Sequence, residues 1–200
     1  MLSGQAIKEA IESHKDYLRI RDNPKENPLY DRQLASVERE PRIVIEPYNA
    51  SQLNPNSYNL RLADKLLIYT GDKLDMAADN PTEEIQIPKE GLVLEPGNLY
   101  LGSTIEHTET YNLVPRLDGR SSIGRLGISI HITAAYGDIG FSGCWTLEIS
   151  VIHPIRVYAG VQLCQISYEQ VQGEIEKTYS GKYQGTSEAK ASNLFKEFAT

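Results

Sequence analysis

The sequence predicts a mainly β fold, an antiparallel sandwich or barrel that begins with one helix. Two observations support this prediction. From residue 42 onward, short β-like runs follow one another closely, and turn-forming stretches such as NPNS, TGD, PKEG and EPGN separate them. Helical periodicity is clear only near the N-terminus. Many short strands with few helices favour a sandwich or barrel over a layered α/β fold.

The N-terminal segment predicts a helix that Ser3 can cap. The residues that recur there at helical spacing are Ile7, Ala10, Ile11, His14 and Leu18. Residues 21–41 are polar and include three prolines, so they predict a long loop or insertion. A partly helical stretch from Tyr30 to Glu38 is the alternative for this region.

The sequence pattern of residues 42–200 predicts several strands followed by a C-terminal tail. The expected strands lie within residues 42–48, 59–70, 85–88, 92–103, 126–133, 145–152 and 155–171. Residues 179–200 are small and polar apart from Leu194, Phe195 and Phe198, and they predict a mobile C-terminal lid over a site. A length of 200 residues fits one domain, 1–200, that is large enough to bury a core.

Composition restricts the function classes. Asp and Glu number 27 and Lys and Arg number 20, a formal net charge of −7, which disfavours binding of nucleic acid polymers. A small nucleotide needs only a few local cations and backbone N–H groups. No stretch approaches the roughly 18 apolar residues that cross a bilayer, and no signal peptide is evident, so we expect a cytoplasmic protein. Cys144 and Cys164 form no CxxC pair and are expected to be buried free thiols.

Residues 117–134, LDGRSSIGRLGISIHITA, contain the first candidate site. Small residues let backbone N–H groups approach an anion, hydroxyls donate further bonds, and a guanidinium offers two parallel donors to phosphate. The block matches neither GxGxxG nor GxxxxGK[ST]. Considered alone, a tight turn with solvated arginines is the commoner explanation. The residues concerned are Gly119, Arg120, Ser121, Ser122, Gly124, Arg125 and Gly127.

Glu148 is the second candidate, a carboxylate in the middle of an otherwise uncharged strand. Strand alternation places it on the same face as Thr146 and opposite to Leu147 and Ile149. By base rate such a residue is a solvent-facing glutamate. The functional alternative is a carboxylate in a cleft that acts first as a base and then as an acid. His131, on the polar face of the preceding strand, is expected to be a structural hydrogen-bonding residue.

These blocks resemble the signature of the dCTP deaminase branch of the dUTPase-like superfamily: GRSSIGRLG with HITA, then GDIGFSG and TLE. Further stretches that resemble the family are LSGQAIKEAI, LNPNSYNLRLAD, LEPGNLYLGSTIE, VYAGVQLCQISYE and YSGKYQG. The likeness covers most of the chain except the region of residues 20–42. GRSSxGRLG and TLE are specific in combination and weak alone. The resemblance implies a dUTPase-like distorted β-barrel with an N-terminal helix and a few short helices, and a homotrimer with sites between subunits.

Residue by residue, the resemblance implies a nucleotide site. The triphosphate would bind a loop of Arg120, Ser121, Ser122, Ile123, Gly124 and Arg125. The sugar 3′-hydroxyl would bind Asp138, and the base would lie against Thr146, Leu147 and Glu148. The residues that would complete the site as the tail closes are Gln165, Tyr179 and Lys182. Mg²⁺ would accompany the triphosphate, dUTP would be a second substrate in some relatives, and dTTP would act as an inhibitor.

The reaction implied is hydrolysis of dCTP to dUTP and ammonia, which supplies dUMP for thymidylate synthesis. Most nucleobase deaminases use zinc held by His and Cys in an HxE…PCxxC pattern, and this sequence lacks it. We therefore expect no zinc, with Glu148 carrying the protons. Ser122 and the backbone around Ala134 are expected to position the water.

Several alternatives stay open. Ala135 and Tyr136 are more similar to the residues of relatives that convert dCTP to dUMP and pyrophosphate. Relatives with a His-Arg pair at these positions only deaminate. A plain dUTPase lacks support because its tyrosine-containing uracil hairpin is missing. A non-catalytic nucleotide-binding module is disfavoured because both the RSSIGR loop and the TLE strand are present. Departures from the family pattern are Ile139 in a turn and Thr186 at a phosphate contact, for which Gln184 is a candidate substitute.

Overall fold

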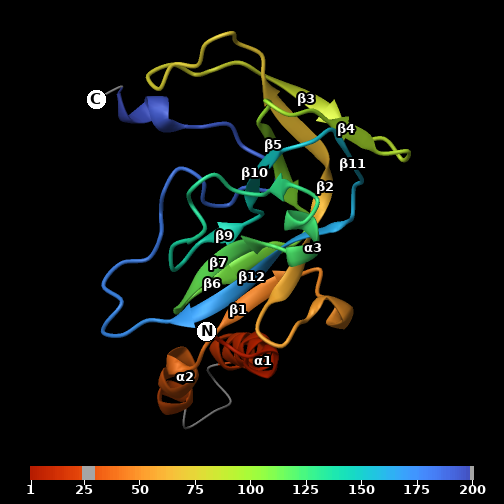
Figure 1. Cartoon of the computed structure of the whole chain (residues 1–200). Coiled ribbons are helices and arrows are strands. Elements are labelled where there is room, and N and C mark those ends of the chain that lie inside the picture. The colour runs from red at the N-terminus through yellow and green to blue at the C-terminus, as the bar shows by residue number, and fades with distance from the viewer. Residues whose placement is uncertain (24–29, 199–200) are drawn as a thin grey trace.

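The computed structural model describes residues 1–23 and 30–198, which form a mainly β structure as the sequence predicts (Figure 1). The largest sheet contains, in spatial order, β7 (Leu113–Gly119), β12 (Gln162–Gln170), β2 (Tyr58–Tyr69), β5 (Tyr100–Thr104), β10 (Thr146–Val151) and β8 (Ile128–Ser129), with β3 (Thr82–Gln86) paired to β2. A second sheet contains β1 (Ile43–Glu46), β6 (His107–Thr110) and β9 (Ser142–Gly143). A ribbon contains β4 (Leu92–Leu94) and β11 (Ile155–Val157). These pairings are antiparallel.

One segment, residues 130–137, connects the two ends of the large sheet. At one end, Glu148 in β10 donates its N–H to the carbonyl of Ile130 at 2.9 Å. At the other end, Leu117 in β7 donates its N–H to the carbonyl of Ala135 at 2.8 Å. The sheet therefore curves into a nearly closed, distorted barrel, which confirms the predicted fold class. The segment that completes the barrel also contains a predicted site residue.

The core of the barrel is built on β2, the strand that runs the length of the molecule (Figure 1). Its fully buried side chains include Tyr58, Leu60, Leu62 and Leu66. β5 passes close by with Gly102, where an added Cβ would lie 2.9 Å from Leu62 and 3.0 Å from Ile149 of β10. The close approach of these three strands therefore favours glycine at this position.

Helix α1 (Gly4–Arg21) begins as predicted. The Ser3 hydroxyl accepts a hydrogen bond from the N–H of Ala6 at 3.2 Å and caps the first turn. Ile7, Ala10 and His14 are buried, so the predicted helical spacing marks the face that packs on the barrel.

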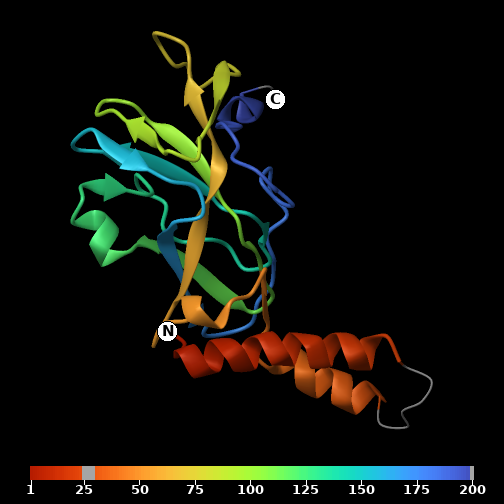
Figure 2. The same cartoon turned by 90° about the vertical axis from the view of Figure 1, so that its right-hand side faces the viewer.

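A second helix, α2 (Tyr30–Arg39), packs beside α1, and the two project together from one end of the barrel (Figure 2). The predicted loop over residues 21–41 is therefore wrong for residues 30–39, where the helical alternative is confirmed. The three prolines of this region flank the helix in sequence and do not interrupt it. The other part of the expected loop, residues 24–29, lies outside the described residues.

The predicted strand over residues 126–133 is wrong beyond Ser129. β8 ends there, and Ile132, expected on the apolar face, is 58% exposed. The chain leaves β10 after Ile130 and crosses towards β7, so residues 131–133 do not run along a paired strand. Strands β6, β7 and β9 had not been predicted, because they are short or contain polar residues and Pro115.

The short helices implied by the resemblance are α3 (Ser121–Gly124), η2 (Ala50–Gln52) and η3 (Leu194–Glu197). Both cysteines are buried and free, as predicted, and burial raises the pKa of the Cys144 and Cys164 thiols. Within the described residues, no helix combines the length and the apolar character that crossing a membrane requires.

Candidate active site

A cavity of about 500 Å³ opens beside β10. Its walls come from β10, from the segment around residues 134–141, from the loop after β2 and from the C-terminal tail. Segments far apart in sequence therefore meet here. The predicted site residues that line it are Ala134, Asp138, Thr146, Glu148 and Tyr179.

Glu148 lies on the cavity side of β10, as strand alternation predicts. Its neighbours Leu147 and Ile149 are each 1% exposed and belong to the core, whereas Glu148 is half-buried. The Leu147 side chain therefore points into the barrel, and its expected place in the base pocket stays a prediction.

The Glu148 carboxylate is oriented by the backbone of the barrel-closing segment. Its Oε2 accepts a hydrogen bond from the N–H of Ile132 at 2.7 Å. The other oxygen, Oε1, accepts no hydrogen bond from the described residues. It is therefore available to water or substrate. The donor comes from the bend that interrupts the predicted strand over residues 126–133.

Asp138 begins a tight turn at another wall of the cavity. The N–H of Phe141 donates to the Asp138 carbonyl at 3.2 Å, and Gly140 has a φ of 88°, a conformation that glycine adopts without strain. Ile139, which departs from the family pattern, therefore still permits the turn. The orientation of Asp138 towards a sugar hydroxyl stays a prediction.

The predicted phosphate loop forms a separate feature, the single-turn helix α3 and its flanks. Arg120 precedes the helix, and its Nη1 donates to the carbonyl of Gln162 at 2.7 Å. Ile123 is buried and anchors the turn. Ser121, Ser122, Gly124 and Arg125 are exposed. None of these residues lines the cavity that contains Glu148, so the expected position of Ser122 beside the catalytic water is not found within this chain.

Gln165 lies next to the phosphate loop rather than in the cavity beside β10. Its Oε1 accepts from the Ser57 hydroxyl at 2.8 Å, and its Nε2 donates to the carbonyl of Gly119 at 3.3 Å. Both ends of this amide are therefore used in contacts within the protein.

The C-terminal tail crosses the rim of the cavity. The carbonyl of Thr186 accepts from the N–H of Cys144 at 2.7 Å, and the N–H of Lys190 donates to Thr146 Oγ1 at 3.1 Å. The tail thus occupies the position expected of a lid, while its mobility stays a prediction.

Two candidate phosphate contacts in the tail are engaged elsewhere. Lys182 forms an ion pair with Glu197, whose hydrogen bond raises the pKa of the lysine. Gln184 accepts from the N–H of Ser142 at 3.1 Å and donates to the carbonyl of Gly140 at 2.8 Å. In this arrangement Gln184 fastens the tail to the barrel, and its role as a substitute phosphate contact stays a prediction.

A charged cluster at the edge of the cavity had not been predicted. Arg116 Nε lies 2.9 Å from Asp118 Oδ2, and its guanidinium lies 5.3 Å from the ring centroid of Tyr136, which is 59% exposed. The carboxylate of Asp118 raises the pKa of Arg116. His131 approaches Asp118 only to 3.9 Å, too far for a hydrogen bond, so its expected structural role is not supported. The alternation of charges just before the phosphate loop was the available sequence signal.

The candidate residues therefore form two groups, a carboxylate-containing cavity and an arginine-containing loop. Among the described residues, no group of three His, Cys, Asp or Glu side chains is arranged to hold a metal ion. The cavity can place a carboxylate oxygen beside a small ligand, whereas the two arginines of the loop lie outside it.

Comparisons with known proteins identify the family. A family model described as dCTP deaminase-like matches residues 29–171. A protein of Leptospira biflexa named "dCTP deaminase, dUMP-forming" is 62% identical over 156 residues, 78% of this chain and 90% of that protein. A protein of Hathewaya histolytica with the same name is 60% identical over 156 residues, 78% of this chain and 91% of that protein.

Among solved structures, 2'-deoxycytidine 5'-triphosphate deaminase from Agrobacterium tumefaciens matches with a TM-score of 0.52 at 24% identity. The match covers 70% of this chain and 46% of that one, so this chain spans less than half the length of the solved relative. At this identity the likeness concerns the fold, and it agrees with the distorted barrel described above.

Proposed function

Because the chain belongs to the dCTP deaminase-like family, we propose that it deaminates dCTP and hydrolyses the resulting triphosphate, giving dUMP, pyrophosphate and ammonia. The names of the two relatives described above support the dUMP product. Tyr136 supports the dUMP product as well, because relatives that only deaminate carry a His-Arg pair at the positions of Ala135 and Tyr136. Deamination that stops at dUTP, the reaction first expected from the sequence, is the second candidate.

The observation that carries the proposal is the placement of Glu148 in the cavity with one oxygen fixed and the other available. Water adds to C4 of cytosine while Glu148 takes one of its protons and passes it to N3. Glu148 then takes the proton of the new C4 hydroxyl and delivers it to the 4-amino nitrogen, so the C4–N bond breaks, ammonia leaves and C4 becomes a carbonyl. The Ile132 N–H keeps the carboxylate directed at the reacting atoms throughout.

Replacing the carboxylate by an amide tests this assignment. Glu148→Gln retains size and hydrogen bonding but has no basic oxygen, so ammonia release from dCTP should fall by at least about 10²-fold while nucleotide binding persists. Glu169→Gln on β12, away from the cavity, is the matched control. Normal ammonia release by Glu148→Gln refutes the proposal.

Product analysis separates the two candidate reactions. Wild-type enzyme with dCTP and Mg²⁺ should give dUMP and pyrophosphate by anion-exchange chromatography, and it should also convert added dUTP. Accumulation of dUTP with ammonia, and no turnover of added dUTP, favours the second candidate.

A second copy of the chain completes the site in this proposal. The phosphate loop with Arg120 and Arg125 lies outside the cavity of its own chain, yet a triphosphate requires cations close to the base pocket. A homotrimer in which the loop of one copy faces Glu148 of the next satisfies both requirements.

Mg²⁺ enters this proposal with the substrate, because triphosphate oxygens are the hard ligands that it prefers. Zinc has no part in it, because Glu148 transfers the protons and its fixed oxygen is bound by a backbone N–H rather than by a metal-ligating side chain. Binding of dTTP to the same site, as an inhibitor, is expected from the shared sugar and triphosphate.

A further inference from the structure

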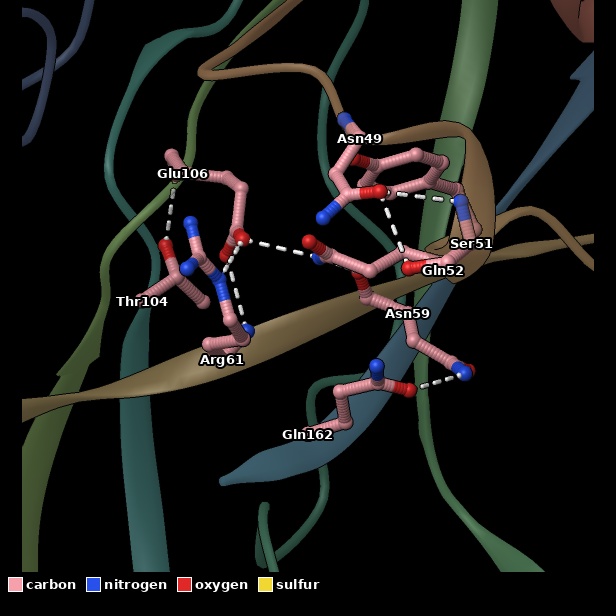
Figure 3. A network of polar contacts seen from close by, with 9 residues as sticks. Asn49, Ser51, Gln52, Asn59, Arg61, Thr104, Glu106 and Gln162 are labelled. Atoms are coloured by element: carbon pink, nitrogen blue, oxygen red, sulfur yellow. Dashed lines mark hydrogen bonds and ion pairs between the residues drawn. The ribbon is translucent and has the colours of Figure 1, made fainter. Parts of the chain in front are cut away.

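A buried carboxylate, Glu106, lies at the centre of a polar network inside the barrel (Figure 3). It is 0% exposed, and it accepts hydrogen bonds from Arg61 Nε at 2.6 Å, the Arg61 N–H at 2.7 Å and Gln52 Nε2 at 2.9 Å. Gln52 Nε2 also donates to the carbonyl of Asn59 at 2.7 Å. Glu106 thereby fixes β2 at Asn59 and Arg61.

Asn59 carries the network from β2 to β12 (Figure 3). Its Nδ2 donates to Gln162 Oε1 at 2.8 Å, and its Oδ1 accepts from Asn54 Nδ2 at 2.8 Å. The main-chain carbonyl of Gln162 accepts from Arg120 Nη1 at 2.7 Å. The polar contacts therefore extend from Glu106 to the guanidinium at the start of the phosphate loop.

A second branch reaches the residue before Arg120. Asn54 Nδ2 also donates to the Ser57 hydroxyl at 3.1 Å, and that hydroxyl donates to Gln165 Oε1 at 2.8 Å. Gln165 Nε2 donates to the carbonyl of Gly119 at 3.3 Å. The two branches hold successive residues of the same loop.

The network meets β12 at an irregular end of the strand. The pairing of β12 with β2 shifts register between Gln162 and Cys164, and its pairing with β7 ends at Cys164 opposite Gly119. Gln162 therefore lies beyond the β7 ladder, and its carbonyl accepts the Arg120 guanidinium instead of a strand N–H. Because a bulge disrupts backbone pairing, side-chain contacts contribute more to the position of this segment.

We propose that Asn59, acting through Gln162, is a positioning residue for Arg120. It holds the irregular end of β12 so that the guanidinium keeps one N–H on the Gln162 carbonyl and presents its remaining donors to a phosphate. This inference rests on the proposed binding of triphosphate by residues 120–125. A planar guanidinium tethered at one nitrogen loses little further entropy when it binds.

The contact between the Asn59 and Gln162 side chains allows a positioning role for Arg120 to be distinguished from a purely structural role. Asn59 is only 5% exposed, so removing the acceptor leaves its Nδ2 unpaired and should lower the thermal stability. The Gln162 carbonyl remains in any variant of its side chain. A change at Gln162 should therefore weaken triphosphate binding through the placement of Arg120, and thermal denaturation measures the loss of stability separately.

The test uses Gln162→Met, which keeps the side-chain length but removes the acceptor for Asn59. Inorganic triphosphate with Mg²⁺ is titrated by calorimetry, and deoxycytidine, which has no phosphate, by ligand-observed NMR. We expect triphosphate affinity to fall about tenfold and deoxycytidine affinity to stay within about twofold. The KM for dCTP should rise with kcat nearly unchanged. Gln86→Met on β3, whose amide donates to the carbonyl of Asp64 at 2.8 Å, is the matched control.

Equal triphosphate affinity in Gln162→Met and the wild type overturns the positioning role. An equal loss for deoxycytidine also overturns it, because that result indicates a general distortion. Gln162→Ala repeats the measurement if thermal denaturation shows that the methionine variant does not fold. A wild type that binds triphosphate without converting dCTP refutes the proposed function alone, whereas one that does not bind triphosphate refutes both.

Discussion

Mixing two impaired variants tests whether one nucleotide site is built from two copies of the chain. Glu148 faces the cavity beside β10, whereas Arg120 is held by the Gln162 carbonyl outside it. If Arg120 of one copy serves Glu148 of the next, Glu148→Gln and Arg120→Ala each damage all sites of a homotrimer. A mixed trimer, however, contains some sites with an intact glutamate from one variant and an intact arginine from the other.

The expected recovery follows from this division. With equal amounts and random assembly, half of the sites have an intact glutamate and half of those face an intact arginine, so about one quarter are complete. The mixture should recover about a quarter of the wild-type kcat per chain. Arg120→Ala alone should lose about 10- to 150-fold in kcat/KM, because a hydrogen bond to a charged group contributes roughly 1.5–3 kcal/mol.

The assay is ammonia release from dCTP after the two variants are unfolded together in urea and refolded, with trimer mass checked by light scattering. A chain that carries both substitutions, refolded with Glu148→Gln, is the control, because that mixture contains no intact glutamate. Activity of the mixture equal to the mean of the separate variants refutes the shared site and places Arg120 beside Glu148 of its own chain.

The remaining predictions concern folding, thiol reactivity and the metal ion. Gly102→Ala should lower the free energy of unfolding by about 1–3 kcal/mol, because a Cβ there presses on packed side chains, and an unchanged urea midpoint contradicts this. Burial raises the pKa of the Cys144 thiol, so maleimide at about pH 7 should modify it far more slowly in the native protein than in urea, and equal rates count against its burial. Removal of Mg²⁺ with a chelator should abolish dCTP turnover, and added Mg²⁺ without zinc should restore it; a requirement for zinc contradicts the proton-transfer role of Glu148.

Sequence periodicity placed Glu148 correctly because β10 satisfies the conditions under which alternation is informative. β10 pairs with β5 on one side and β8 on the other, and one of its faces packs on the barrel core. Under these conditions the buried residues must recur at every second position. The faces of Leu147, Glu148 and Ile149 could therefore be assigned without knowledge of the fold.

The same reasoning failed for residues 126–133 because apolar alternation there does not correspond to a paired strand. Ile128 and Ile130 are buried beside β10, but the chain then turns away and leaves Ile132 exposed. Which edge a segment joins depends on closure of the whole sheet, and local sequence does not contain that information. The misassigned bend supplies the N–H that binds the Glu148 carboxylate, so the error fell on a segment of the candidate site.

The separation of the phosphate loop from Glu148 could not be predicted from sequence patterns either. Motifs close in sequence suggested one site, and only the resemblance implied that subunits share it. The network from Glu106 through Asn59 was not predicted either, because its members are ordinary polar residues on β2, on β12, in the segment around Gln52 and between β5 and β6. No spacing rule links such residues before the strands are placed beside one another.

The division of charge between cavity and loop has an electrostatic reason. The described lining of the cavity contains two carboxylates, Asp138 and Glu148, and one lysine, Lys190, whereas the loop contributes Arg120 and Arg125. A triphosphate is repelled by the first group and attracted by the second, so the proposed site made from both should admit the nucleotide in one orientation, with C4 towards Glu148. Under this proposal a chain of net charge −7 binds a triphosphate through local cations. The proposed orientation also keeps the phosphates away from Glu148, which avoids repulsion between the two negatively charged groups.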